Sequence, residues 1–409
     1  MKQERSYPRI LVSDKGADWV KGGHPWIYEG EVRGIEGDVE NGCLADAVSL
    51  KGSWLGTGLF SEQSKIRLRL ISRNPNDRFD GAFWQRRIEY AWRYRKRVMD
   101  GQTNCCRVIF GEADGFPGLT VDRFSELLVT QTLSAGMERL KPLLFPLLAE
   151  VLRKDGQEIR GIFERNDVAI RELEGLKQGK GWFPLPGETP PESRLTEICE
   201  NGVRYGVDVE NGQKTGFFLD QKFNRQAVAR LARGQRVRDC FTHTGSFALN
   251  AAKGGALSVE GWDISAAAVA MAEENARRNG LEQVARFSVC DVFDRLTQLS
   301  VSGARPFDFI ILDPPAFTKS RKTADRAERG YYEINYRAMK LLPRGGYLAT
   351  ASCSHFMPNE RFVRMLHSAA REAEVQLRQI ELRQQAPDHP ILWNVPETDY
   401  LKFYLFQVV

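Results

Sequence analysis

The chain has 409 residues, which exceeds one ordinary hydrophobic core and predicts two or three domains. Its apolar share of 42% and charged share of 27% are those of a soluble globular protein, and the net charge of +5 permits an anionic partner without establishing one. It contains no secretory signal, no apolar run that could span a bilayer, and no zinc-ligand or disulfide spacing among its cysteines, so we expect a cytoplasmic protein without a membrane partner or a metal.

Residues 1–73 contain short apolar runs separated by glycines, a pattern typical of a small β-barrel. The last of these runs alternates apolar with basic side chains, as in Leu68 and Arg69. This alternation predicts a strand with one basic face exposed to solvent, and a solvated edge strand is the simplest explanation of it.

Residues 78–99 have the pattern of a helix in which aromatic and basic side chains are mixed, with seven basic and two acidic residues between 78 and 97. Such a mixture suits RNA, because cations pair with phosphates and bases stack on aromatic rings or guanidinium planes. An RNA-binding helix with Arg86, Arg93 and Arg97 at the interface, and an interdomain helix with a solvated basic side, explain the pattern equally well. Reversing the charges of Arg93, Arg95 and Arg97 together should weaken RNA binding only in the first case.

The rest of the chain divides into a small α+β segment and a longer alternating one. From about residue 217, strands alternate with helices, which predicts a doubly wound parallel sheet. Helices are expected in this part at 246–252, 265–279, 292–299, 332–342 and 358–373. We thus expect an α/β protein with a β-barrel at 1–73, a basic helix with a central α+β domain at 74–195, and a Rossmann-like domain at 196–409.

Polar residues follow the expected parallel strands, where open sheets of this kind bind ligands. The first strand leads into the turn Thr242-His243-Thr244-Gly245-Ser246, which lacks the G-x-G-x-x-G pattern of a dinucleotide site. S-adenosylmethionine has no phosphate and needs only one close backbone approach there. Asp263, after the second strand, could accept from the ribose hydroxyls, and Asp291, after the third, from the adenine amino group. Each acid alone is more often a helix cap, but their succession predicts an S-adenosylmethionine site.

The next two strands end in an acid and a thiol. Asp313 begins the run DPPAF, whose prolines fix an extended turn that would project Asp313 and Phe317. Cys353 ends the following strand, although an isolated cysteine is usually a small buried hydrophobe. Cytosine C5 attacks a methyl sulfonium only after a thiolate adds to C6 while an acid stabilises N3. Cys353 and Asp313 would supply this chemistry.

The chain resembles the bacterial large-subunit ribosomal RNA 5-methylcytosine methyltransferases that carry an N-terminal PUA domain. The similarity rests on the runs TGFFLDQKFNR, FTHTGSFA, LDPPAFTKS, RGYYEINYRAMKLL, SCS, QAPDHP and YLKFYLF. Residues 1–73, with GGHPWIYEGEV, look like the PUA barrel, so the similarity covers the whole chain. It implies an S-adenosylmethionine-dependent RNA methyltransferase with ribosomal RNA as substrate, and members of this architecture can form homodimers.

The resemblance also implies roles for individual residues. Cys353 would attack C6, and Asp313 would hold the base edge beside the cofactor. The methyl donor would be held by residues after successive strands, namely Asp263, Asp291 and the turn Thr242, His243, Thr244, Gly245 and Ser246. Gln221 and Lys222 would reach the cofactor or the RNA backbone. Phe317 would stack on a flipped base, and Lys319, with its neighbours Arg321 and Lys322, would bind phosphates unless that loop is merely solvated.

The sequence departs from the expected pattern at two places, and it leaves alternatives open. Ala316 stands near the point where many related enzymes carry a second cysteine, so the base that removes the C5 proton is unassigned, and His243 replaces an expected aromatic residue. His355 and His389 are candidate proton carriers, although structural roles are the commoner ones for such residues. The alternatives are a methyltransferase of exocyclic amines in adenine or guanine and a non-catalytic RNA-binding or ribosome-assembly factor.

Overall fold

The computed structural model describes residues 6–302, 305–318 and 323–409, and the chain folds into two compact units. The first unit contains Met1–Ile198, Val207–Leu219 and Pro387–Thr398. The second contains Cys199–Gly206, Asp220–Ala386 and Asp399–Val409. Within the described ranges, no helix combines the length and the hydrophobicity needed to cross a bilayer.

The N-terminal part of the first unit is a six-stranded sheet with the order β2-β6-β5-β4-β1-β3. Its buried side chains, such as Ile10, Ile27 and Leu68, form one apolar core. A short helix that the sequence analysis did not predict follows the first strand, with Ser13 accepting from the amide of Gly16 at its start. The elements are β1 (Arg9–Val12), α1 (Asp14–Lys21), β2 (Trp26–Tyr28), β3 (Val32–Glu36), β4 (Leu44–Ser49), β5 (Trp54–Phe60) and β6 (Ile66–Ser72).

The prediction of a solvated basic face on β6 is wrong. β6 lies between β2 and β5 and is not an edge strand. Arg69 is buried and its guanidinium lies 2.8 Å from the carboxylate of Glu174, while Arg67 pairs with Glu29 at 2.6 Å. The basic side chains of this alternation form ion pairs with acidic residues far along the chain, and the Arg69–Glu174 pair is buried. Local spacing does not reveal such partners.

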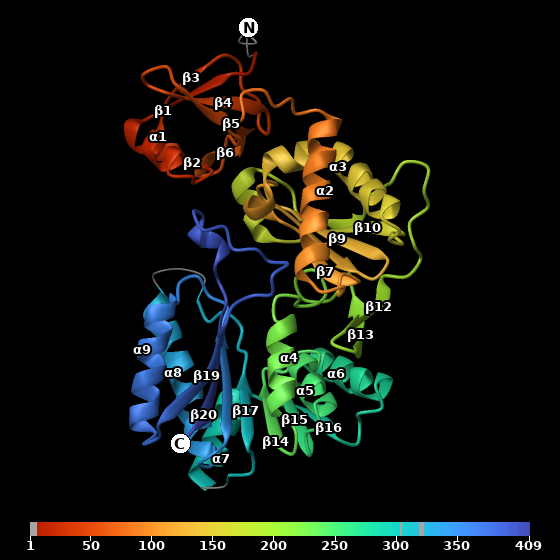
Figure 1. The fold of residues 1–409 in the computed structure, drawn as a ribbon, viewed down its shortest axis with the longest axis vertical. Helices are drawn as coiled ribbons and strands as arrows, with labels where there is room; N and C mark the ends of the chain where they lie inside the picture. Colours follow the sequence, from red (N-terminus) through yellow and green to blue (C-terminus); the bar gives the residue numbers. More distant parts are fainter. Residues whose placement is uncertain (1–5, 303–304, 319–322) are drawn as a thin grey trace. The chain divides into compact units, whose positions relative to one another are not determined.

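The remainder of the first unit is a five-stranded sheet with the order β11-β10-β9-β8-β7, accompanied by two long helices (Figure 1). Asp80 caps the first of these helices by accepting from the amide of Phe83 at 2.9 Å. Arg95 of this helix is fully buried and forms a two-pronged ion pair with Asp114, so its predicted place on an exposed basic face is wrong. The elements are α2 (Gly81–Val98), β7 (Cys105–Phe110), β8 (Leu119–Phe124), β9 (Leu127–Thr132), α3 (Ala135–Lys154), β10 (Gly161–Arg165) and β11 (Lys180–Trp182).

The second unit is built on a seven-stranded sheet with the order β16-β15-β14-β17-β18-β20-β19. The strands from β16 to β18 run parallel, as predicted, whereas the unpredicted β19 and β20 run antiparallel to their neighbours. The strands are β14 (Arg236–Cys240), β15 (Ser258–Asp263), β16 (Ala285–Val289), β17 (Phe309–Leu312), β18 (Tyr347–Ser352), β19 (Leu377–Arg383) and β20 (Lys402–Val408). A separate two-stranded sheet is formed by β12 (Leu195–Glu200) and β13 (Val203–Asp208).

Helices cover both faces of this sheet, with α4, α5 and α6 on one side and α8 and α9 on the other (Figure 1). The predicted helices are present with small shifts at their ends, except that α8 begins eight residues before the predicted start at 332. The helices are α4 (Lys222–Leu231), α5 (Ser246–Lys253), α6 (Ala266–Arg278), α7 (Val292–Ser302), α8 (Ala324–Leu341) and α9 (Asn359–Glu372). This arrangement confirms a doubly wound α/β sheet in the C-terminal part of the chain.

Candidate active site

The strand order of the large sheet reverses between β14 and β17, because β15 lies on one side of β14 and β17 lies on the other. In open α/β sheets, ligands bind beyond the carboxyl ends of the strands at such a reversal. The polar residues predicted from the sequence follow the carboxyl ends of β14, β15, β17 and β18. All four strand ends belong to the second unit and lie along the same edge of its sheet.

The turn after β14 has an unusual backbone. Phe241 and His243 have φ values of 65° and 50°, and Gly245 has 82°. A side chain at Gly245 would also collide with its neighbours, because a Cβ there would lie 3.0 Å from the ring of Phe287. Non-glycine residues adopt positive φ rarely and often at functional sites. The turn leads directly into α5, whose N-cap residue Gly245 has no side chain to cap the helix, so the amides of Ser246 and Phe247 at its start can receive an anionic group.

Asp239, near the end of β14, holds this turn in place. Its Oδ2 accepts from Thr242 Oγ1 at 2.6 Å and from the amide of Ala248 at 2.9 Å. Its Oδ1 is buried and has no hydrogen-bond partner among the described residues. Burial, together with the nearby carboxylates of Asp313 and Asp263, raises the pKa of Asp239 to about 7. An unsatisfied carboxyl oxygen of this kind fits a ligand that carries a positive charge or a hydrogen-bond donor.

Asp263, at the end of β15, links two segments of the site. Its Oδ2 accepts from the amide of His243 at 2.9 Å, and its Oδ1 accepts from the amide of Ser265 at 2.9 Å. Each carboxylate oxygen keeps a further lone pair for a ligand hydroxyl. The next residue, Ile264, leaves 72% of its side chain exposed, which provides an apolar surface directly beside the carboxylate.

Two other residues predicted to hold the cofactor have clear structural partners. Asp291 is exposed and caps α7, because its Oδ1 accepts from the amide of Phe293 at 2.8 Å. His243 is mostly buried, and this burial lowers its pKa to about 4, so that its ring is neutral at physiological pH. Asp291 thus fulfils the helix-cap role that we weighed for it, while its second oxygen has no hydrogen bond to a described residue.

Asp313 lies directly after β17 and is only partly exposed. Its Oδ1 accepts from Gln221 Nε2 at 2.9 Å, and Gln221 Oε1 in turn accepts from Asn224 Nδ2 at 2.6 Å. The chain of amides fixes the Asp313 carboxyl group at the sheet edge. Lys222, at the start of α4, is fully buried, so its side chain is not presented on the surface.

Cys353 follows β18 and is half-buried, so it is not sealed in the apolar interior. Two ionisable side chains from other elements lie close enough to interact electrostatically with it, Tyr331 of α8 and Lys402 of β20. Burial raises the pKa of Tyr331, and negative charges on Cys353 and Asp313 raise it further. Cys353 and Asp313 follow the carboxyl ends of β18 and β17, which are adjacent parallel strands, so both groups lie at one end of the sheet.

Lys402 is a buried cation directly beside this thiol. It is the strand partner of Ser352, and its Nζ donates to the carbonyl oxygens of Ser354 at 2.7 Å and Tyr400 at 2.9 Å. Burial lowers the pKa of Lys402 to about 8, whereas charges on Cys353 and Asp399 would raise it. A buried ammonium group that is bonded to the residue next to a cysteine favours the thiolate form of that cysteine.

Phe317 belongs to an aromatic cluster at the same sheet edge. Its ring centroid lies 4.7 Å from that of Tyr331, 5.8 Å from that of Phe293 and 6.4 Å from that of Phe241. It remains only partly buried. The predicted phosphate-binding residues Lys319, Arg321 and Lys322 lie outside the described residues.

The two histidines considered as proton carriers have different surroundings. His355 is exposed, and its ring centroid lies 5.7 Å from that of Tyr400. His389 belongs to the first unit, is buried, and has its Nδ1 2.8 Å from the carboxylate of Asp388. The pairing of His389 with Asp388 corresponds to the structural role that we considered the commoner one.

Comparison with known proteins identifies the family. Residues 185–407 match the S-adenosylmethionine-dependent methyltransferase family, and residues 10–73 match the PUA-like domain. The protein named ribosomal RNA large subunit methyltransferase I of Klebsiella pneumoniae (strain 342) is 37% identical over 406 residues, which cover 98% of this chain and 99% of the relative. The protein of the same name from Aeromonas salmonicida is 41% identical over 381 residues, covering 93% and 94%. The chain belongs to the ribosomal RNA large subunit methyltransferase I family.

Solved structures agree with the fold of this methyltransferase. A Streptococcus mutans protein assigned to the S-adenosylmethionine-dependent methyltransferases has a TM-score of 0.80 at 20% identity and covers 98% of this chain and 100% of its own. The protein SMU.776, solved in complex with S-adenosylhomocysteine, has a TM-score of 0.81 with the same identity and coverage. These findings confirm the family resemblance, the α/β fold class and S-adenosylmethionine as the methyl donor.

The sequence analysis missed four residues at this methyltransferase's sheet edge, namely Asp239, Ile264, Tyr331 and Lys402. The first two carried a usable signal, because Asp239 precedes the predicted cofactor turn and Ile264 directly follows Asp263. Tyr331 and Lys402 carried no such signal, since Tyr331 is one of three tyrosines in its segment and the sequence around Lys402 does not show which strand β20 pairs with. Only the helix packing and the antiparallel β20 bring them to Cys353.

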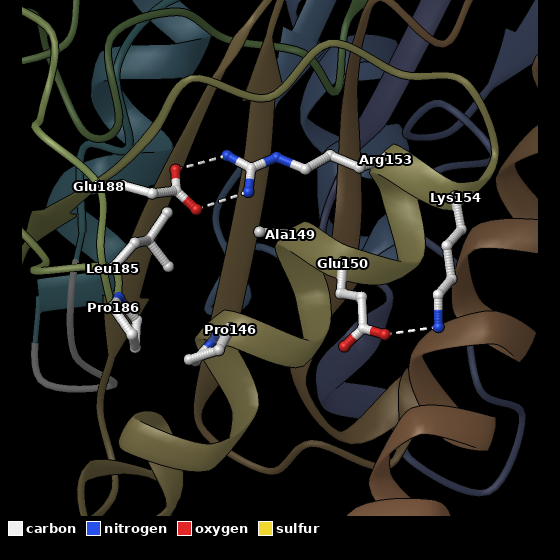
Figure 2. Close-up of a pocket in the computed structure, with 8 residues that line it drawn as sticks. All are labelled: Pro146, Ala149, Glu150, Arg153, Lys154, Leu185, Pro186 and Glu188. Atoms are coloured by element: carbon white, nitrogen blue, oxygen red, sulfur yellow. Dashed lines mark hydrogen bonds and ion pairs between the residues drawn. The ribbon is translucent and has the colours of Figure 1, made fainter.

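A hollow in the first unit contains none of these residues (Figure 2). It has a volume of about 500 Å³ and lies against α3. Figure 2 shows Arg153 and Glu188 paired across one side of it and Glu150 with Lys154 on the other. Its charged groups are already paired with one another, so it offers no catalytic group.

Proposed function

We propose that this methyltransferase forms 5-methylcytosine in large-subunit ribosomal RNA and that Cys353 is its nucleophile. The observation that supports this most strongly is the partly exposed Cys353 beside the buried ammonium group of Lys402, on the same sheet edge as Asp313. The RNA substrate is proposed from the names of relatives such as the Klebsiella pneumoniae protein and from the PUA-like domain. The cytosine and its C5 atom are proposed from the thiol, because methylation of an exocyclic amine needs no nucleophilic cysteine.

The residues of the second unit fit S-adenosylmethionine at the reversal between β14 and β17. The amides of Ser246 and Phe247 at the start of α5 can receive the methionine carboxylate, and the turn through Thr242, His243, Thr244 and Gly245 would surround the methionine end of the cofactor. Asp263 would accept from the ribose hydroxyls, and Ile264 would cover one face of the adenine. Asp291 would accept from the adenine amino group. Gln221 and Asp313 would border the reacting end.

The residues around Cys353 would divide the reaction between them. S-adenosylmethionine, when bound, supplies a methyl group on a sulfonium. The Cys353 thiolate would form a bond to cytosine C6 while a protonated Asp313 transfers its proton to N3, which makes C5 nucleophilic toward that methyl group. After methylation, loss of the C5 proton would restore the C5–C6 double bond and expel the thiolate, and the N3 proton would return to Asp313. Lys402 would stabilise the Cys353 thiolate both when it attacks C6 and when it is released. Phe317 would support the flipped base.

The direct test is nucleoside mass spectrometry of ribosomal RNA incubated with the protein and S-adenosylmethionine bearing a labelled methyl group. We expect the label in 5-methylcytidine. A label in N6-methyladenosine or N2-methylguanosine would instead support the exocyclic-amine alternative, for which the Asp313-Pro314-Pro315 turn also has the right composition. If the protein bound no S-adenosylmethionine in a calorimetric titration, a non-catalytic RNA-binding or assembly role would replace both.

Replacing Asp263 by alanine should weaken cofactor binding by about 10- to 100-fold. The variant loses the proposed ribose acceptor and two hydrogen bonds that hold the turn at His243 and Ser265, each of which contributes about 0.5–1.5 kcal/mol. Isothermal titration with S-adenosylhomocysteine measures the effect. Asp308→Ala is the matched control, because Asp308 precedes β17 at the opposite edge and pairs with Arg236. Equal affinities of the Asp263→Ala and Asp308→Ala variants would contradict the proposed ribose site.

Two further proposals concern the protein in the cell. We infer a cytoplasmic location, because the relatives' names specify ribosomal RNA as substrate. We also expect that the protein can form a homodimer, as the family resemblance implies, and light scattering at micromolar concentration would measure this. A molecular mass equal to that of one chain at all concentrations would contradict the proposed dimer.

A further inference from the structure

The first unit contains a groove along helix α2, which we call the α2 groove and define by Arg73, Asn74, Arg86, Tyr90 and Tyr94. Its volume is about 780 Å³. One wall is formed by α2 and the other by the end of β6 and the loop that follows it. The volume lies in the range of about 300–1,000 Å³ that is usual for ligand sites, and no residue of the candidate active site lines it.

The α2 wall of the groove presents aromatic rings to solvent. Arg86, Tyr90 and Tyr94 are spaced four residues apart and therefore lie on one face of the helix. Tyr90 is 60% exposed and Tyr94 is 38% exposed, which is unusual for such large rings on a packed helix. The guanidinium of Arg93 lies 4.8 Å from the centroid of the Tyr90 ring. A ring held in this way is suited to stacking with another flat, electron-rich group such as a nucleobase.

The acidic residues of the groove are engaged within the protein. Asp114 forms the two-pronged ion pair with Arg95, with N–O distances of 2.5 and 2.7 Å. Glu112 accepts from Trp26 Nε1 at 3.0 Å. Asp77 accepts hydrogen bonds from Ser72 at the end of β6 and from Asn74 in the loop that follows it. These carboxylates therefore have donors already and are held toward the protein.

The basic residues Arg86 and Arg73 of the groove have fewer hydrogen bonds and ion pairs within the protein than its acidic residues have. Arg86 is exposed and has no hydrogen bond or ion pair with any described residue. Arg73 is also exposed, and its guanidinium donates to the carbonyl oxygen of His24 at 3.3 Å. Arg97, one turn beyond Arg93 on the same helix, is exposed as well. Guanidinium groups with unused donors beside exposed rings are suited to a polymer that alternates phosphates and bases.

We propose that the α2 groove binds a single-stranded stretch of RNA, separate from the nucleotide that is methylated. One base would stack on Tyr90, and the flanking phosphates would contact Arg86 and Arg73, with Arg93 and Arg97 extending the path along α2. A single strand is required, because the bases of a duplex are stacked on one another and their faces cannot reach the Tyr90 ring. The identity of the polymer as RNA rests on the proposed function. The groove itself and the exposed ring of Tyr90 are observed independently of that function.

The test measures binding of a fluorescent twelve-nucleotide oligouridylate by anisotropy, without S-adenosylmethionine, so that it does not depend on methyl transfer. Tyr90→Ala should weaken binding by about tenfold, whereas Tyr90→Phe should retain most of it because the ring remains. Arg86→Glu should weaken binding and reduce the slope of log affinity against log salt by about one. Arg371→Glu is the charge-matched control, because Arg371 is exposed on α9 in the second unit, and it should bind the oligomer normally.

The outcomes separate this proposal from the methylation proposal. If Tyr90→Ala loses affinity but no 5-methylcytidine is formed by the wild-type protein, the groove is supported and the proposed reaction fails. Unchanged binding by Tyr90→Ala would overturn the groove, whatever the reaction product. Equal competition by a twelve-base-pair duplex RNA would overturn the assignment to a single strand. Thermal melting and titration with S-adenosylhomocysteine check that each variant is folded.

Discussion

Cys353→Ala is expected to lower the rate of RNA methylation by about a thousandfold or more, which corresponds to a barrier increase of about 4 kcal/mol. The reason is chemical, because C5 of cytosine has no route to sufficient nucleophilicity once the group that adds to C6 is gone. Affinity for S-adenosylhomocysteine should change little, since Cys353 is not among the groups that we propose for cofactor binding, which precede α4 or follow β14, β15, β16 and β17. Tritium or mass-spectrometric detection of methyl transfer under single-turnover conditions measures this rate.

A matched control and a trapping experiment make the result specific to one thiol. Cys199→Ser, at an exposed cysteine of β12, should methylate at the wild-type rate. RNA in which the target base is 5-fluorocytosine should accumulate a covalent adduct with the wild-type protein, because fluorine cannot leave as the C5 proton does. Peptide mapping should locate the adduct at Cys353. Retained methylation by Cys353→Ala, or an adduct at another cysteine, would refute the proposed nucleophile.

The residues at the carboxyl edge of the large sheet could be predicted from the sequence, because each strand and the polar residue that follows it are contiguous in the chain. An apolar run such as Phe309–Leu312 predicts a buried strand, and the polar residue that follows it must lie at the carboxyl end. Asp263, Asp313 and Cys353 were found in this way, since parallel strands bring their carboxyl ends to one edge. The family resemblance then assigned roles to them that the geometry alone does not give.

The electrostatic surroundings of these residues could not be predicted, because they depend on partners far along the chain. Arg69 looked like a solvated cation until the fold brought Glu174 to it, and Arg95 of α2 is buried against Asp114 for the same reason. Lys402 lies 49 positions after Cys353 and reaches it only because β20 pairs with β18 in the antiparallel direction. Local spacing determines which residues share a strand end, but tertiary packing determines their charge state.

Lys402→Met is expected to lower methylation at pH 7 by about 10- to 1,000-fold, because loss of an adjacent opposite charge raises the pKa of a thiol by about 1–3 units. Lys402→Arg should recover part of the rate, since it restores the positive charge in a less suitable shape. At pH 9, where the thiol of the methionine variant ionises without help, its deficit should be smaller. A deficit that is equal at all pH values would indicate only a structural role for Lys402.

The pH dependence of the wild-type enzyme follows from the same pair of residues. Burial lowers the pKa of Lys402 to about 8, so its side chain is positively charged below that pH and loses this charge above it. Stabilisation of the Cys353 thiolate is therefore strongest below about pH 8 and declines as the pH rises further. Alkylation of Cys353 by iodoacetamide reports the thiolate directly, and its midpoint should move to higher pH in Lys402→Met, whether or not RNA is present. The same midpoint in both proteins would mean that the ammonium group does not act on the thiol, and the proposed activation of Cys353 would have to come from another group.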